Sequence, residues 1–196
     1  IRTCIEILSS LPSVVVGLFG YLIFVVQFQY GFSILSGALA LTVFNLPQMT
    51  RNVEDGLRNV HHTQREAGLA LGLSRWETVV HVVIPEALPS IVTGIVLASG
   101  RIFGEAAALI YTAGQSAPAL DWGNWNPLSV TSPISIFRQA ETLAVHIWKV
   151  NSEGTIPDAT QVSQGSAAVL LVFILIFNLS ARYIGKKLHA KLTSAK

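Results

Sequence analysis

The chain has 196 residues, of which 51% are hydrophobic and 12% are charged, and its net charge is +2 at pH 7. Soluble domains carry about 25% charged residues, so this chain lacks the polar coat of a soluble protein and is predicted to lie in a bilayer. The small net charge says little about nucleic acid, and we expect no nucleic-acid partner. The single cysteine, Cys4, excludes an intrachain disulfide and a cysteine-based metal site.

Four stretches of the chain each approach the length of about 20 apolar residues that a membrane-spanning helix needs. They are residues 11–28, 31–49, 90–113 and 165–181. None of them alternates polar and apolar residues as the strands of a membrane barrel do. Because the backbone must satisfy its own hydrogen bonds in lipid, the sequence predicts an all-α polytopic membrane protein.

The loop between the second and third stretches, residues 50–89, carries strong local signals for helix ends. Thr63 and Glu66 have the spacing of a capping box, and so do Ser74 and Glu77. Gly72 lies between the two boxes, where a left-handed residue commonly ends a helix. These signals predict two short helices joined by a tight turn.

The predicted helices of this loop cover residues 64–71 and 75–84, with the turn at 72–73 and with Pro85 and Pro89 marking the return to the membrane. Such a stiff helix-turn-helix has two interpretations: it is a connector, or it is a projection that a cytoplasmic partner binds. The residues near its tip are unusually apolar for an exposed loop, which favours a partner. They are Leu69, Leu71, Leu73 and Trp76.

The segment after the third stretch, residues 114–164, is long and faces the opposite side of the membrane. Ser132 followed by Pro133 is typical of a helix start. The apolar residues from Phe137 to Trp148 then recur with helical spacing. The sequence predicts an amphipathic helix that begins after Ser132 and lies on the outer surface.

The distribution of lysine and arginine predicts the orientation of the chain. With four spans, the start of the chain, the loop 50–89 and the tail 182–196 lie on one side of the membrane. The positive-inside rule places that side in the cytoplasm, because it carries ten cationic residues and the opposite side carries two. The ten are Arg2, Arg51, Arg58, Arg65, Arg75, Arg182, Lys186, Lys187, Lys191 and Lys196, and the two are Arg138 and Lys149.

Two charged residues, Arg101 and Glu105, lie inside the third predicted span, four residues apart on one helix face. Each charge costs about 2.5–3.5 kcal/mol at the centre of a bilayer, so the pair is expected to face the interior of the protein. One interpretation is a structural ion pair that fixes the helix register. The other is a binding point for an anion, in which Arg101 binds the oxygens and Glu105 holds Arg101 when the path is empty.

Arg51 and Glu54 lie at the inner end of the second predicted span. They are either a helix-end pair or part of the cytoplasmic exit of the same path. Motifs for catalysis are missing from the sequence. There is no G-x-x-x-x-G-K-[ST] sequence to hold ATP, and the five histidines form no H-E-x-x-H metal motif. The sequence therefore predicts no enzyme, no catalytic residue, no metal site and no cofactor bound by this chain.

The charged loop resembles the EAA loop of ABC-importer permeases, in which Glu-Ala-Ala is followed by three residues, Gly, nine residues and Ile-x-Leu-Pro. In this chain Glu66, Ala67 and Gly68 fill the triad and Gly72 fills the glycine, while Val82, Ile84 and Pro85 fill the end of the motif. Gly68 replaces alanine, Val82 replaces isoleucine and Ile84 replaces leucine.

Further segments are similar to the PstA-type permease of phosphate importers. They are LPSVVVGLFGYLIF, LPQMTRNVEDGLRNV, GRIFGEAAALIYTAG, TSPISIF and FNLSARYI, and together they extend over essentially the whole chain. Ala106 and Ala108 stand where many relatives have Thr and Pro. The resemblance implies a type I ABC-importer permease fold, with four membrane helices of a probable six in a single transmembrane domain, residues 1–196. Because the chain begins at Ile1 and its one methionine is Met49, we expect an N-terminal part to precede it.

The resemblance also implies a function. The chain would be a permease subunit in a bacterial cell membrane that forms part of the path for inorganic phosphate, with Arg101, Glu105, Arg51 and Glu54 along the path. The EAA loop would dock on a cytoplasmic ABC ATPase dimer, which hydrolyses the ATP, through Glu66, Ala67, Gly68 and Gly72 with Leu71 and Leu73 at the tip. The other implied partners are a homologous second permease subunit, an external phosphate-binding protein and membrane lipid. The alternatives are the same architecture for another oxyanion or small solute, and a membrane transporter or scaffold without an ATPase.

Overall fold

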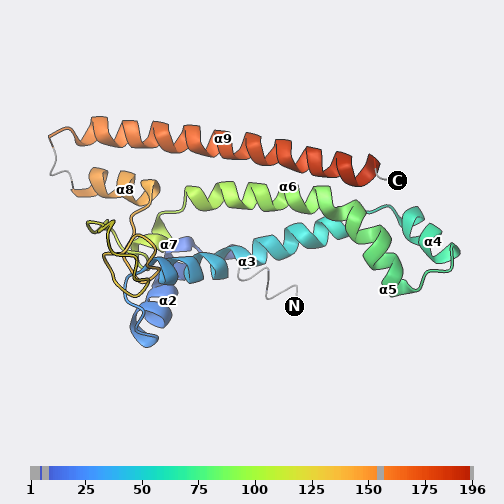
Figure 1. Cartoon of the computed structure of the whole chain (residues 1–196), viewed down its shortest axis with the longest axis horizontal. Coiled ribbons are helices and arrows are strands. Elements are labelled where there is room, and N and C mark those ends of the chain that lie inside the picture. Colours follow the sequence, from blue (N-terminus) through green and yellow to red (C-terminus); the bar gives the residue numbers. More distant parts are fainter. Residues whose placement is uncertain (1–4, 6–8, 154–156, 195–196) are drawn as a thin grey trace. The chain divides into compact units, whose positions relative to one another are not determined.

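The computed structural model describes residues 5, 9–153 and 157–194, so Arg2, Cys4 and Lys196 lie outside the described residues. All regular structure in the described part is helical, as predicted (Figure 1). The α-helices are α2 (Ser13–Gly20), α3 (Ile34–Arg58), α4 (His62–Ala70), α5 (Arg75–Thr78), α6 (Ile84–Phe103), α7 (Ala107–Ile110), α8 (Leu143–Glu153) and α9 (Ala159–Ser194). Two π-helices, η1 (Tyr21–Gln27) and η2 (Val79–Val83), continue α2 and α5.

Two helices of the described part are long and apolar enough to cross a bilayer, judged by length and composition. They are Arg75–Phe103, which overlaps the third predicted span, and Ala159–Gly185, which contains the fourth. The helix in the first predicted span, Ser13–Gln27, is apolar but shorter than a bilayer requires. Helix α3 covers most of the second predicted span and continues past Met49 to Arg58. The structure thus supports two of the four predicted spans by this criterion.

The chain forms two compact units, and the first comprises Ile1–Pro47 and Arg101–Ile174. Within it, glycines let helices approach closely: a Cβ on Gly17 would lie 2.9 Å from the Cα of Ala108, and one on Gly37 would lie 2.8 Å from the Cβ of Ala113. The core of this unit consists of Leu109, Ala113 and Val145, with Leu41, Ala106 and Ile110 packed around it. This packing fixes α3 against the segment that contains α7.

The helix predicted to begin after Ser132 begins only at Leu143, as α8, and the chain before it is irregular. The carbonyl groups of Ile136 and Arg138 instead accept hydrogen bonds of 2.9 Å from the backbone N–H groups of Leu35 and Ile34. The N–H groups of a first helical turn have no partner within their own helix, so this pairing satisfies the start of α3. The tertiary partner therefore decides the conformation of this segment.

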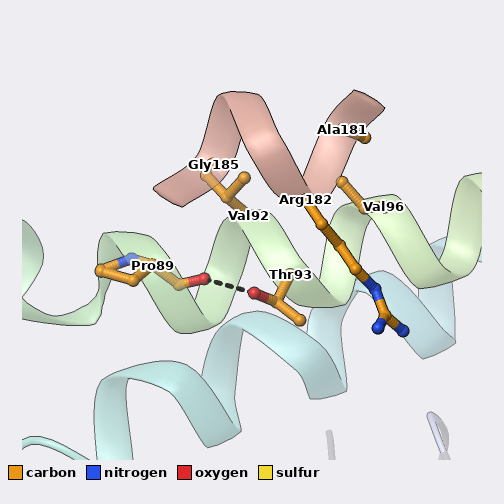
Figure 2. Close-up of a pocket in the computed structure, with 7 residues that line it drawn as sticks. All are labelled: Pro89, Val92, Thr93, Val96, Ala181, Arg182 and Gly185. Carbon is orange, nitrogen blue, oxygen red and sulfur yellow. Dashed lines mark hydrogen bonds between the residues drawn. The ribbon is translucent and has the colours of Figure 1, made fainter. Parts of the chain in front are cut away.

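The second unit comprises Gln48–Gly100 and Leu175–Lys196. Within it, a Cβ on Gly94 of α6 would lie 2.8 Å from the Cβ of Asn52 of α3, and the Asn52 side chain donates a 3.1 Å hydrogen bond to the Gly94 carbonyl. On another side of α6, a pocket of about 360 Å³ lies between α6 and α9 (Figure 2). There the Arg182 side chain extends from α9 past α6, where the Thr93 hydroxyl donates to the Pro89 carbonyl at 2.8 Å.

Candidate functional site

The charged loop forms a compact projection, here called the knob, that consists of residues 62–83 in α4, α5, η2 and the turn between them. Gly72 ends α4 with a φ of +83°. The N–H of Leu73 donates to the carbonyl of Gly68 at 3.2 Å. The N–H of Gly72 donates to the carbonyl of Leu69 at 3.0 Å. This pair of hydrogen bonds is the Schellman motif, so the predicted left-handed stop at Gly72 is confirmed.

The second helix of the knob begins with the predicted capping box. The Ser74 hydroxyl accepts from the N–H of Glu77 at 3.3 Å, and the Glu77 carboxylate accepts from the N–H of Ser74 at 2.8 Å. Hydrogen bonding by the Ser74 side chain, and then by its backbone N–H, lowers the pKa of Glu77, which lies in the loop outside the predicted spans. This box fixes the direction in which the second helix leaves the turn.

The other predicted capping box, Thr63 with Glu66, is wrong. Helix α4 begins at His62 with His61 at the N-cap position, so Thr63 already lies within its first turn and cannot cap it. Glu66 instead contacts His62, one turn earlier, with 3.1 Å between its Oε1 and the histidine Nδ1. Both side chains are largely exposed, so Glu66 is available on the surface of the knob.

The prolines after the knob do not end its second helix, contrary to the prediction. Helix α5, η2 and α6 form one continuous helix from Arg75 to Phe103. Pro85 lacks an N–H and its ring conflicts with the carbonyl four residues earlier. The chain accommodates it by widening into a π-helix over Val79–Val83, which ends two residues before Pro85, rather than by breaking.

Gly68 lies inside the knob and not on its surface. A Cβ on Gly68 would lie 2.9 Å from the Cγ2 of Thr78 and 3.4 Å from the Cγ2 of Val82. The small residue therefore lets α4 pack closely against α5 and η2. Its neighbour in the motif, Ala67, is exposed.

The tip of the knob exposes apolar side chains. Leu71 is 83% exposed and Trp76 is 74% exposed, while Leu69 is exposed to a lesser degree. Leu73 is half-buried, and Gly72 has open space around it. Exposed apolar groups of this size on an ordered base are typical of a protein interaction site.

The base of the knob is fixed by contacts that the sequence analysis missed. The Arg65 guanidinium donates a 2.7 Å hydrogen bond to the carbonyl of Leu57 near the end of α3, where cationic groups satisfy free carbonyls. Val60, Val83 and Ala87 form a buried cluster with Leu57 and Ile91 packed against it. The apolar spacing of these residues in the sequence is the signal that could have located the cluster.

Arg101 and Glu105 do not lie on one helix face, contrary to the prediction. Helix α6 ends at Phe103, and the N–H groups of Gly104 and Glu105 close its last turn onto the carbonyls of Arg101 and Ile102, each at 3.1 Å. The Glu105 carboxylate turns toward the next helix and accepts a 3.3 Å hydrogen bond from the N–H of Ala108. Between the described residues, no ion pair joins Arg101 to Glu105.

Arg101 instead lies in the last turn of α6, where its side chain is exposed. Its guanidinium carbon is 5.2 Å from the centre of the Phe44 ring, a cation–π contact. The helix break at Gly104 occurs with Ala106 and Ala108 in the following residues, so α6 ends at this point without a proline after it.

The two predicted residues at the inner end of the second span, Arg51 and Glu54, lie on α3, where both are half-buried. Glu54 forms an ion pair of 2.9 Å with Arg58, one turn further along α3. This contact has the i, i+4 spacing that stabilises the end of a helix. It favours the helix-end interpretation for Glu54.

Residues 1–193 match the family described as "Binding-protein-dependent transport system inner membrane component". A Bacillus subtilis protein described as a probable ABC transporter permease, YqgI, is 59% identical over 194 residues, which are 99% of this chain and 66% of the relative. The phosphate transport system permease PstA 2 of Mycobacterium bovis is 35% identical over 186 residues, which are 94% of this chain and 57% of the relative.

The predicted resemblance to PstA-type permeases is confirmed by a further relative. PstA of Xylella fastidiosa is 35% identical over 188 residues, which are 93% of this chain and 58% of the relative. This chain therefore spans 57% to 66% of the length of the relatives named here. No solved structure matches it. Because the family match extends over nearly every residue, the chain belongs to the family of inner-membrane components of binding-protein-dependent transport systems.

Proposed function

We propose that this chain is a permease subunit of an ATP-driven importer and forms part of the membrane path for inorganic phosphate. A cytoplasmic ABC ATPase dimer hydrolyses the ATP and binds the knob. A homologous second permease subunit completes the path, and an external phosphate-binding protein delivers the anion. The chain lies in a bacterial cell membrane as a multi-pass protein with four spans in a single domain, and its knob and C-terminus are cytoplasmic.

The exposed apolar tip on a rigid base is the observation that supports coupling to an ATPase. Leu71 and Trp76 together present large apolar side chains to solvent. Their backbone positions are fixed by the Schellman motif, by the capping box and by the close packing of Gly68 on Thr78. A surface that is ordered before binding loses little conformational entropy when a partner covers it. The tip is therefore suited to transmit the movement of a partner.

Phosphate is the favoured cargo for two reasons. Relatives that are 35% identical to the chain over the aligned residues are described as phosphate transport permeases. In addition, the Arg101 guanidinium contacts an aromatic ring, while the carboxylate that the sequence predicted as its partner, that of Glu105, accepts a hydrogen bond from Ala108. A guanidinium without a carboxylate partner keeps its charge and its planar set of donors available for oxyanion oxygens.

The proposal is tested by replacing Leu71 or Trp76 with serine in the complete transport system. We expect either change to lower the amount of ATPase that co-purifies with the permease in detergent, because the centre of an interface carries most of its binding energy. Leu128→Ser is the matched control, because Leu128 is 74% exposed in the segment predicted to lie outside the cell. Unchanged co-purification of the ATPase with the tip variants would contradict the coupling role.

The cargo is tested in the same cells by uptake of labelled phosphate. We expect uptake to depend on ATP and to be lowered by excess unlabelled phosphate but not by equal amounts of sulfate or molybdate. Competition by sulfate or molybdate as strong as that by phosphate would support the alternative of a permease for another oxyanion. Uptake that does not depend on the ATPase would support a different class of transporter.

A further inference from the structure

Phe44 is an aromatic residue of α3 to which the sequence analysis assigned no role. Its ring centre lies 5.2 Å from the guanidinium carbon of Arg101, and both residues belong to the first compact unit. The position of Phe44 is well defined, because α3 is packed against the chain around α7 through Gly37 and Ala113. The ring is half-buried, while the Arg101 side chain is exposed.

The kind of contact that holds an arginine determines what else it can bind. A carboxylate binds the edge of the guanidinium, where the N–H donors lie, and it also neutralises the charge. An aromatic ring interacts with the cation through its face and carries no net charge. Arg101 held by Phe44 therefore keeps both its positive charge and its N–H donors for an oxyanion.

The residues around Arg101 agree with an aromatic contact in place of a carboxylate contact. Glu105, which could compete for the guanidinium, is turned away by the helix break at Gly104 and accepts from the N–H of Ala108. The same break ends α6 two residues after Arg101, so this arginine projects from the last turn of the helix. Phe44 is the contact within the described residues that restrains its side chain.

We infer that Phe44 is a positioning residue that holds the Arg101 guanidinium by its ring so that Arg101 can bind the oxygens of a transported phosphate. This inference rests on the proposed function, because it assumes that phosphate passes Arg101. It adds a residue from a different helix to the anion path. The ring contributes by restricting the arginine to one region of space before the anion arrives, which lowers the ordering cost of binding.

The test compares Phe44→Leu with Phe44→Tyr in cells that carry the complete transport system. The initial rate of labelled phosphate uptake is measured at phosphate concentrations below half-saturation, where weaker binding of the anion lowers the rate. Leucine keeps an apolar side chain but removes the ring, and we expect the rate to fall about two- to five-fold, as the strength of an exposed cation–π contact predicts. Tyrosine keeps the ring, and we expect a rate close to that of the parent. A role in packing would also favour tyrosine over leucine, but it would lower the membrane level of Phe44→Leu or the amount of ATPase that co-purifies with it.

Two further controls make the result specific. Phe173→Leu removes another ring that lies near the end of α6, where it contacts Phe103 at 5.2 Å between ring centres. We expect this variant to retain the parental uptake rate. All variants are compared at equal membrane level and equal co-purification of the ATPase, so that a folding defect is not read as a transport defect.

Arg101→Gln separates the inference from the proposed function. If Arg101→Gln lowers uptake while Phe44→Leu transports at the parental rate, or if Phe44→Tyr is as slow as Phe44→Leu, the role of Phe44 is refuted and the proposed function stands. If Arg101→Gln transports at the parental rate, the proposed path fails, and the inference about Phe44 fails with it.

Discussion

Replacing Gly68 with alanine is the sharpest test of how the knob is built. The added methyl group would lie 2.9 Å from the Cγ2 of Thr78, 3.3 Å from its Oγ1 and 3.4 Å from the Cγ2 of Val82. The first distance is shorter than a carbon–carbon contact allows, so α4 has to move away from α5 and η2. Overpacking of this kind costs about 1–3 kcal/mol, and alanine regains about 1 kcal/mol through its higher helix propensity.

We expect the packing of α4 against α5 and η2 to lose about 1 kcal/mol of free energy. The population of molecules in which α4 has opened locally is then roughly five-fold larger. Hydrogen exchange of the backbone amides of α4 in the purified complex measures this population. We expect these amides to exchange about five-fold faster in Gly68→Ala. The amides in the middle of α9 are expected to be unchanged and serve as the internal control.

A second substitution identifies the atom responsible. Thr78→Ser removes the Cγ2 that the new methyl would meet but keeps the hydroxyl, which donates a 3.0 Å hydrogen bond to the carbonyl of Ser74. In a double-mutant cycle, Thr78→Ser should restore most of the protection lost in Gly68→Ala, because the two residues share one contact. Parental exchange rates in Gly68→Ala, or additive effects in the double mutant, would refute the packing argument.

Two further predictions concern the turn of the knob. Gly72 has a φ of +83°, and a Cβ added to it would meet no atom within 4 Å. Gly72→Ala should therefore cost about 1–2 kcal/mol of stability through backbone strain alone. Gly72→Asn should cost less, because asparagine tolerates this conformation. Hydrogen exchange of the turn measures both, and an equal loss of protection in the two variants would contradict the argument from backbone strain. Ser74→Ala should destabilise the start of α5 by about 1 kcal/mol because it removes the capping hydroxyl, whereas Ser74→Thr should retain most of the cap. Limited proteolysis within the turn reports this difference, and equal cleavage of both variants would count against the capping box.

Local signals predicted the parts of this protein whose hydrogen bonds close within a few residues. The Ser74–Glu77 capping box and the left-handed Gly72 both satisfy groups at most five residues away, so the residue types and their spacing were sufficient. The helical character of the apolar stretches could be predicted for the same reason, because an α-helix bonds its backbone within one turn. The motif around Glu66 likewise located the knob.

Contacts between distant segments decided what the sequence analysis missed. The chain around Ile136 bonds to the start of α3, so the helix expected after Ser132 begins only at Leu143. Gly68 was expected on the docking surface, but Thr78 lies directly against it. Neither partner is indicated by the spacing of residues along the chain, because each contact depends on how separate helices pack.

The environment of Arg101 likewise depends on one feature that the sequence predicts and one that only packing decides. The sequence by itself determined that a cation lies inside an apolar stretch predicted as a membrane span, and the i, i+4 spacing favoured Glu105 as its partner. That spacing brings side chains together only while the helix continues, and α6 ends at Phe103. Tertiary structure then supplied Phe44 from α3 in place of the carboxylate. The sequence specified the charge, and the packing of two helices decided what that charge can bind.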